Sequence, residues 1–291
     1  KWNAKMPTFM FISWRQPGVF DVPIEADQKY LWMHDIDAGD TLTAQRAVKI
    51  DRLWVMSRWH RSHLLQKYGF LRDEQIIVLG NGIDPDRFDQ VGQDRDNAVI
   101  YSSSPDRGLE QALTYWPEIH KKTGAELRVF YGWETWDRMR GDVRQPGYKQ
   151  KIMDLAKQDG VVWKGRVGQR DLGQEMLKAK VLFYPGPHEF CETFCITALE
   201  AQAAGCVPVT RDNGALPETN QHGIVVHSDA KPSRWIAAVQ EALTTSDADR
   251  SKMRQWARGQ TWAAVAERAI QGSIALDKIT QDKEQKLAIS A

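Results

Sequence analysis

The sequence alternates short apolar runs with longer amphipathic segments, and this alternation restricts the possible folds more than any other feature. Several runs are nearly continuous in Val, Ile, Leu and aromatic residues, which is typical of strands covered on both faces. A strand followed by a helix, repeated along the chain, predicts parallel α/β sheets. The predicted strands are 8–14, 29–34, 52–56, 75–79, 98–102, 127–132, 160–165, 181–186, 207–210 and 223–227.

The segments between these runs space their apolar residues as amphipathic helices do. Together with the strands they indicate doubly wound sheets, in which helices cover both faces. The predicted helices are 42–50, 58–68, 106–122, 147–158, 171–179, 192–204, 231–243 and about 247–275.

A polar, turn-rich stretch, DPDRFDQVGQDRDN at 84–97, separates four predicted strands from the six that follow. It carries almost nothing that a core would bury, which is typical of a linker. We therefore predict two Rossmann-like, doubly wound domains, 1–92 and 93–260, of which the first is short. A C-terminal helix, about 261–291, is expected to pack back on the first domain.

Charge and cysteine content restrict the partners and the compartment. With 39 basic and 38 acidic residues, the net charge of +1 creates no global attraction to nucleic acid or anionic lipid. No apolar run approaches the roughly 20 residues that span a bilayer. The sparse Cys191, Cys195 and Cys206 indicate a reducing compartment, and their apolar surroundings favour buried side chains over zinc ligands. We expect a cytoplasmic protein, with a peripheral contact at the inner face of the membrane left open.

The stretch CETFCITALEAQAAGCVPV, 191–209, places two glutamates in apolar surroundings. A helix over 192–204 would stop at Gly205 and carry Glu192 in its first turn, where the helix dipole favours a carboxylate. Eight residues separate Glu192 from Glu200, roughly 12 Å along a helix axis. That distance is too long for an acid and a base acting on one bond, but it suits two contacts along an extended ligand.

The loop before this helix, within VLFYPGPHEF at 181–190, links a strand to a helix N-terminus. Backbone N–H groups at such a terminus bind phosphate. The whole arrangement therefore fits a ligand with hydroxyls at both ends and phosphates between them, such as a nucleotide sugar. The alternative is that Glu192 only caps its helix and Glu200 is simply exposed.

An ordered series of motifs resembles family 4 of the retaining glycosyltransferases, which have the GT-B fold. The stretch E-T-F-C-I-T-A-L-E-A-x-A-x-G-x-x-P-V is similar to the E-x7-E signature of that family. The supporting motifs are WMHD (32–35), VLGNGIDPDRF (78–88), YSSSPDRGLEQAL (101–113), WKGRVGQRDLGQEMLKAKVLFYPGPHE (163–189) and VTRDNGALPE (209–218).

The resemblance implies two domains facing across a cleft and a role for each matching residue. Glu192 would hold hydroxyls of the transferred sugar, Glu200 those of the ribose, and Arg107 the diphosphate. His34 would lie near the transferred sugar, and is expected with Glu192 and Arg107 in the catalytic set. The implied donor-binding set is Ser103, Ser104, Arg107, Gly165, Arg166, Val167, Thr193, Phe194, Cys195, Glu200 and Gly214.

Three departures from the family pattern accompany the resemblance. Ser103 or Ser104 stands where a further cation is common, and Cys195 replaces a common glycine. The glycine-rich loop of the family's first domain has no counterpart, so we expect that domain to be short or truncated.

The resemblance implies a retaining transferase that moves a sugar from a nucleoside-diphosphate sugar to a hydroxyl of a glycan or glycolipid, as in polysaccharide biosynthesis. No metal and no cofactor are expected, because Arg107 and helix N-termini would neutralise the departing diphosphate. Nucleic acid is not an expected partner. Two alternatives remain open: a non-catalytic nucleotide-sugar-binding module and a GT-B sugar-nucleotide epimerase.

Other motifs are weaker. GNGIDP (80–85) imitates half of a dinucleotide fingerprint, but Pro85 occupies the third glycine position. His60 and His63 have no third ligand nearby, which favours a surface helix over a metal site. Core packing is favoured over sugar stacking for four tryptophans of the first domain, Trp14, Trp32, Trp54 and Trp59.

Overall fold

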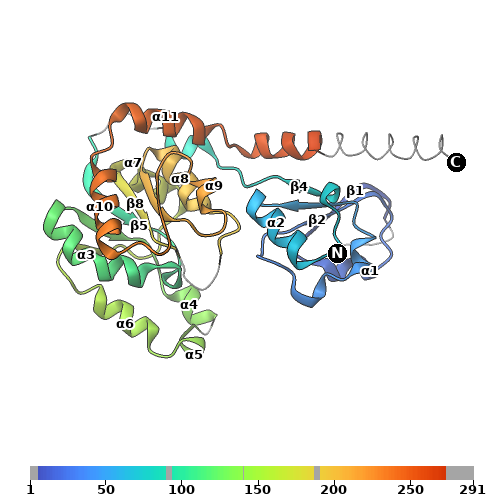
Figure 1. The fold of residues 1–291 in the computed structure, drawn as a ribbon, viewed down its shortest axis with the longest axis horizontal. Helices are drawn as coiled ribbons and strands as arrows, with labels where there is room; N and C mark the ends of the chain where they lie inside the picture. Colours follow the sequence, from blue (N-terminus) through green and yellow to red (C-terminus); the bar gives the residue numbers. More distant parts are fainter. Residues whose placement is uncertain (1–5, 90–93, 140, 187–190, 273–291) are drawn as a thin grey trace. The chain divides into compact units, whose positions relative to one another are not determined.

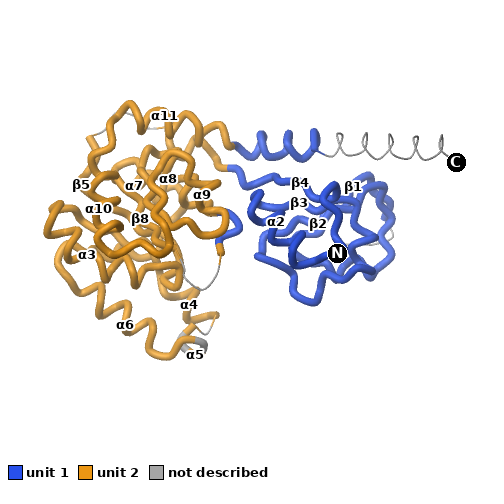
Figure 2. Tube along the Cα trace, viewed as in Figure 1, with its two compact units in different colours: residues 1–82, 192–194, 261–291 blue, residues 83–191, 195–260 orange. Residues whose placement is uncertain are grey.

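A computed structural model describes residues 6–89, 94–139, 141–186 and 191–272 (Figure 1). The chain forms two compact units (Figure 2). The first comprises Lys1–Gly82, Glu192–Phe194 and Thr261–Ala291, and the second Ile83–Cys191 and Cys195–Gln260. All ten predicted strands are present, each within a few residues of its expected bounds. Within the described residues, no helix is both long and apolar enough to cross a bilayer.

The first unit is built on a parallel sheet with the strand order β1-β2-β3-β4. Because the strands follow one another in chain order, connections of the usual right-handed sense all fall on one face. Those connections include the helices α1 (Ala44–Ala47) and α2 (Arg58–Lys67). The strands are β1 (Thr8–Trp14), β2 (Ala26–Trp32), β3 (Arg52–Val55) and β4 (Ile76–Val78).

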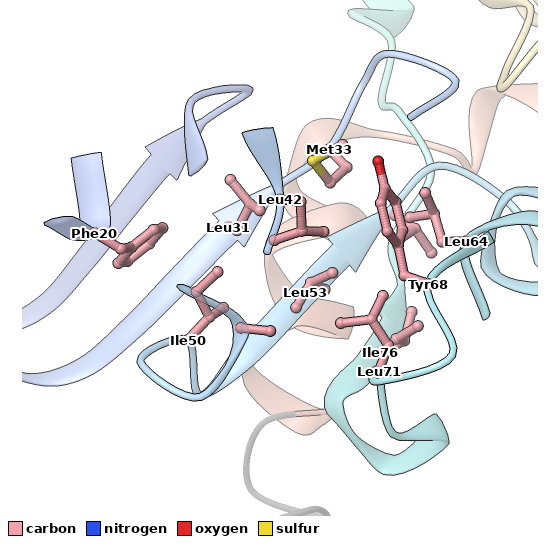
Figure 3. Packing of buried hydrophobic residues seen from close by; sticks show 12 residues of the cluster. Phe20, Leu31, Met33, Leu42, Ile50, Leu53, Leu64, Tyr68, Leu71 and Ile76 are labelled. Atoms are coloured by element: carbon pink, nitrogen blue, oxygen red, sulfur yellow. The ribbon is translucent and has the colours of Figure 1, made fainter. Parts of the chain in front are cut away.

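Two apolar clusters cover this sheet. One joins the strands to the connecting segments, and Figure 3 shows Leu31 and Leu53 of neighbouring strands in it with Phe20 and Leu64. The other joins Tyr30, Trp54 and Ile77 to Val265. Val265 belongs to a helical segment, 262–272, whose Arg268 Nε donates to the backbone carbonyl of Leu79 at 3.1 Å. The C-terminal segment therefore packs on the first sheet, up to the last described residue.

Two side chains of the first unit, His60 and Trp14, differ in burial from the prediction. The hydroxyl of Ser57 caps α2 by accepting from the backbone N–H of His60 at 3.0 Å, and this turns the His60 ring into the core. The predicted surface position of His60 is therefore wrong. Among the tryptophans, Trp54 is buried as expected, whereas Trp14, on the edge strand β1, is 59% exposed.

The second unit has a six-stranded parallel sheet with the order β10-β9-β8-β5-β6-β7. Counted from β5 this is the order 3-2-1-4-5-6, in which the winding direction reverses between β5 and β8. The strands are β5 (Asp96–Tyr101), β6 (Glu126–Val129), β7 (Val161–Trp163), β8 (Ala179–Tyr184), β9 (Val207–Arg211) and β10 (Ile224–Val226).

Helices cover both faces of this sheet. The helices α3, α6 and α10 pack on one face, and α7, α8 and α11 on the other (Figure 1). Their bounds are α3 (Leu109–Thr123), α6 (Tyr148–Leu155), α7 (Gln169–Lys178), α8 (Ile196–Ala204), α10 (Pro232–Leu243) and α11 (Asp247–Arg258). Short helices that the sequence analysis did not predict are α4 (Glu134–Arg138), α5 (Gly141–Arg144) and α9 (Leu216–Thr219).

The polar stretch 84–97 differs from a free linker. The second unit already begins at Ile83, and the 3-10 turn η4 (Pro85–Phe88) packs against α7 and α8. Phe88 is fully buried, and Arg95 donates to the backbone carbonyls of Ala179 and Ala204. The composition of the segment does not indicate this packing, because only Phe88 and Arg95 anchor an otherwise polar stretch. Residues 90–93 lie outside the described residues.

Candidate active site

A pocket of about 510 Å³ lies in the second unit, where the strands β5, β6 and β7 end. Loops after the carboxyl ends of parallel strands, next to the point where the strand order reverses, are the usual ligand site of such sheets. The pocket brings together Ser103, Ser104, Arg107, Arg166 and Val167 of the predicted donor-binding set.

Most polar residues of the pocket lining come from the loop after β5. They are Ser102, Ser103, Ser104, Asp106 and Arg107. The Ser102 oxygen is buried and has no hydrogen-bond partner among the described residues.

The buried Tyr101 and the half-buried Tyr148 hold this loop in place. The hydroxyl of Tyr101 donates to the backbone carbonyl of Ser104 at 2.7 Å, and that of Tyr148 to the carbonyl of Pro105 at 2.8 Å. Burial raises the pKa of both hydroxyls well above the ordinary value, so both remain neutral donors. The loop is therefore fixed by hydrogen bonds that do not change with pH in the physiological range.

Gly108 lets the loop after β5 approach the loop after β8. Its φ of 101° lies in the left-handed region, and a Cβ there would lie 2.8 Å from the Gly186 carbonyl oxygen. The predicted helix 106–122 consequently begins three residues late: Pro105–Arg107 form a 3-10 turn, and α3 starts at Leu109. Arg107 thus lines the pocket from a 3-10 turn and not from inside an α-helix.

The pocket lining also includes aromatic and apolar side chains. They are those of Phe130, Tyr131, Trp136, Met139 and Val167. Trp136 stacks on Tyr148, with ring centroids 5.4 Å apart and planes at 30°. Such a wall suits a flat, partly apolar ring such as a nucleobase.

Arg166 is a second charged arginine in the pocket lining. Its Nη1 donates to the Thr135 hydroxyl at 3.0 Å, which ties the segment after β7 to α4. Gly165 immediately precedes it in the left-handed conformation, with φ 72°. Gly214, in the loop after β9, has φ 59° and is not among the lining residues.

Glu200 is a buried member of an ion pair. Its Oε1 lies 2.5 Å from Arg87 Nη1, and the residue is 8% exposed. Burial raises its pKa, and the charge and hydrogen bond of Arg87 act in the opposite direction. The alternative in which Glu200 is simply exposed is therefore wrong, because α7, α11 and η4 pack against α8.

Glu192 does not lie in the first turn of a helix. The helix α8 begins at Ile196, with the extended Cys195 as its N-cap and no side-chain cap. Glu192 is 5% exposed and groups, with Thr193 and Phe194, with the first unit. The predicted start at 192 and the spacing along a helix axis are therefore wrong, because contacts to the first unit hold residues 192–194 away from the helix.

Those contacts involve the predicted catalytic histidine. The Thr193 hydroxyl donates to the backbone carbonyl of His34 at 3.0 Å, and the Phe194 ring lies 3.2 Å from where a Cβ on Gly80 would be. His34 follows β2, and its Nε2 is buried without a hydrogen-bond partner among the described residues. Burial, and secondarily Arg15, lower its pKa to about 4, so the imidazole is neutral at physiological pH.

Several of these residues carried no recognisable signal in the sequence. Ser102, Tyr131, Trp136 and Met139 line the pocket, but their residue types are equally common in cores and loops. Arg87 lies within the motif VLGNGIDPDRF, and only the structure shows its contact with Glu200, 113 positions away; neither residue is among those that line the pocket. In the described part of the chain, no group of three or more His, Cys, Asp and Glu side chains is arranged to hold a metal ion.

Comparison with known proteins places these observations in context. A family model described as Glycosyl transferases group 1 matches residues 83–260. None of the curated protein sequences compared matches the chain.

Three solved structures illustrate the likeness in fold. Sucrose-phosphate synthase from Thermosynechococcus elongatus is 16% identical, with a TM-score of 0.63, and the match covers 92% of this chain and 69% of that one. WaaG, a glycosyltransferase involved in lipopolysaccharide biosynthesis, is 17% identical, with a TM-score of 0.61 and coverages of 83% and 73%. A trehalose-phosphate synthase from Burkholderia vietnamiensis is 11% identical, with a TM-score of 0.62 and coverages of 95% and 74%. The predicted fold class, GT-B with Rossmann-like parallel sheets, is confirmed.

Proposed function

This chain belongs to the glycosyl transferases group 1 family, and on that premise we propose that it is a retaining glycosyltransferase of family 4. It transfers a sugar from a nucleoside-diphosphate sugar to a hydroxyl of a glycan or glycolipid. The E-x7-E stretch from Glu192 to Glu200 is its signature. The enzyme acts in the cytoplasm, in polysaccharide biosynthesis, with a peripheral contact at the membrane where the acceptor is lipid-linked.

The observation that carries this proposal is the mixed lining of the pocket, in which aromatic and apolar side chains occur together with a serine-rich loop and Arg107. A nucleobase fits against Phe130, Trp136 and Val167, and phosphates fit the serine-rich loop beside Arg107. Both sets of residues line one pocket of about 510 Å³, within the usual size range of small-ligand sites.

The chemistry proposed for this site is charge neutralisation at the departing diphosphate. Breaking the bond between sugar and phosphate leaves negative charge on the diphosphate, and a fixed cation that faces this charge lowers the barrier. Arg107 supplies a guanidinium that can grip phosphate oxygens bidentately. Transfer on this basis requires no metal ion and no cofactor.

Glu192 and His34 take the side of the transferred sugar in this proposal. Both belong to the first unit, which also contains Thr193 as the link between them. A neutral His34 can accept a hydrogen bond from a sugar hydroxyl through its buried Nε2. Glu192 accepts hydrogen bonds from the same sugar, and Glu200 binds the ribose.

The test is turnover with matched donors. The purified full chain is titrated by calorimetry with UDP, GDP and ADP, and then incubated with sugar conjugates of the nucleotide that binds and simple glycoside acceptors. We expect one diphosphate to bind and its conjugate to give a product that retains the anomeric configuration. Binding without any transfer or hydrolysis would favour a non-catalytic nucleotide-sugar module, and an inverted product would contradict the retaining assignment.

A further inference from the structure

The pair formed by Arg87 and Glu200 joins two segments that are far apart in the sequence. Arg87 lies on the turn η4, where Pro85 occupies the first position and the Asp84 side chain accepts from the backbone N–H of Asp86 at 3.2 Å. Phe88, the next residue, is fully buried and anchors the turn. The Arg87 backbone is therefore held in place independently of its charge.

The guanidinium makes two contacts with defined partners. Nη1 donates to Glu200 Oε1 at 2.5 Å, and Nη2 donates to the backbone carbonyl of Gln169 at 2.7 Å. The side chains of Arg87 and Glu200 are only 13% and 10% exposed. A largely buried pair of this kind is screened little by solvent, so each charge strongly affects the other.

The carboxylate keeps one oxygen available. Arg87 engages Oε1, and no described residue forms a hydrogen bond with Oε2. An ionised carboxylate is an acceptor only and can receive two neighbouring hydroxyls, whereas a protonated one loses part of that capacity. The charge state of Glu200 therefore decides how well it can bind a pair of hydroxyls.

Arg87 also connects Glu200 to the wall of the pocket. Gln169, whose carbonyl it holds, is the first residue of α7, and Val167 and Leu172 on either side of it line the pocket. Gly173 lets η4 approach α7 closely, since a Cβ there would lie 3.0 Å from the Arg87 carbonyl oxygen. A single guanidinium thus ties the α8 carboxylate to the segment that carries Val167 and Leu172.

We propose that Arg87 is a positioning residue that holds Glu200 as an oriented carboxylate for the two hydroxyls of the donor ribose. The inference rests on the proposed function, because it concerns the same nucleotide site. It is supported by the opposing effects on the pKa of Glu200, which burial raises and Arg87 lowers. Removal of Arg87 would leave burial unopposed and the carboxyl group neutral at a higher pH.

The experiment compares Arg87→Met with the native chain by calorimetry over a range of pH. The ligands are whichever of UDP, GDP and ADP binds and its 2′,3′-dideoxy analogue. Both ligands carry the same titrating phosphates, so the ratio of their affinities reports only on the ribose hydroxyls. We expect this ratio to fall with decreasing pH as Glu200 becomes protonated, and to begin falling at a higher pH in Arg87→Met. At a pH below the Glu200 pKa of both proteins, each unit by which the substitution raises this pKa lowers the affinity ratio about tenfold.

Three further variants make the result specific. Arg87→Lys restores a charge and should move the pH profile back toward that of the native chain. Arg87→Gln, which can still donate a hydrogen bond, serves as the neutral variant if Arg87→Met does not fold. Arg258→Met removes a different arginine that pairs with the same segment, at Asp89, and should leave the profile unchanged.

The two proposals fail in different ways. If the native chain binds none of the three diphosphates, the proposed function is wrong and this inference with it. If a diphosphate binds but the ratio in both neutral variants follows the native ratio at every pH, only the role of Arg87 is refuted.

Discussion

At the scale of single residues, three of the predicted site residues are titratable groups affected by burial. Glu192 and Glu200 are buried, and burial, with a smaller effect of Arg15, lowers the pKa of the half-buried His34 to about 4. Perturbed or buried titratable groups are typical of functional sites. Because burial also makes these groups sensitive to substitution, isosteric variants test their function better than truncation to alanine.

Arg107 should contribute most of the affinity for phosphate. Replacing it with alanine should weaken nucleoside diphosphate binding by roughly 1.5–3 kcal/mol, the scale of hydrogen bonds to a charged group. Binding of the corresponding nucleoside should hardly change, as measured by calorimetry. Arg234→Ala, at a surface ion pair with Glu241, is the matched control. Equal losses for nucleoside and diphosphate would show that Arg107 has only a structural role.

Substitution of the two glutamates should impair different steps, binding for Glu200 and turnover for Glu192. Glu200→Gln keeps an acceptor for Arg87 and should weaken diphosphate and nucleotide sugar alike, because both carry the ribose. Glu192→Gln should spare the diphosphate and lower kcat, since it contacts only the sugar on which charge develops. Calorimetry and initial rates measure the two effects. Normal turnover of Glu192→Gln would overturn its proposed role.

At the scale of elements, the first residues of helices are where side-chain positions differ most from the prediction. The Ser57 cap of α2 directs His60 inward, and its Nδ1 accepts from the backbone N–H of Met56 at 3.3 Å. Burial, reinforced by His63, lowers the pKa of His60 from 6.5 to about 4. A helix that looks polar in sequence therefore carries a neutral imidazole in the core.

This histidine should make stability depend on pH. Between pH 6.5 and about 4 the unfolded chain binds a proton at His60 that the folded chain does not, so stability is complete above 6.5 and falls as pH decreases toward 4. His60→Asn, which retains an acceptor for Met56, should show a smaller fall in urea midpoint over this range. The exposed His227→Asn is the control, and an unchanged slope in His60→Asn would contradict the assignment.

At the scale of the whole molecule, the first and last residues of the second unit, Ile83 and Gln260, are neighbours. The backbone N–H of Ile83 donates to the carbonyl of Gln260 at 2.9 Å, which joins the two ends of this unit. The family match covers the same residues, 83–260. The pocket also lies wholly within them.

We therefore expect residues 83–260 to fold alone and to bind a nucleoside diphosphate. Expression of this span, with circular dichroism for folding and calorimetry for binding, checks the prediction, with the full chain titrated in parallel. Transfer to an acceptor should be lost, because the span lacks His34 and the other first-unit residues with which Glu192 and Thr193 group. A folded span that binds none of the diphosphates recognised by the full chain would show that the donor site is not confined to the second unit.

The sequence by itself determined the strands, the α/β class and the position of the serine-rich loop that lines the pocket. These follow from local patterns: apolar runs form strands, and a serine-rich loop with a glycine follows one of them. Tertiary structure alone decided the start of α8 at Ile196, the burial of His60 and the pairing of Arg87 with Glu200. Each of these depends on contacts between distant segments, whose energies outweigh local helix propensity and composition, and no local pattern encodes them.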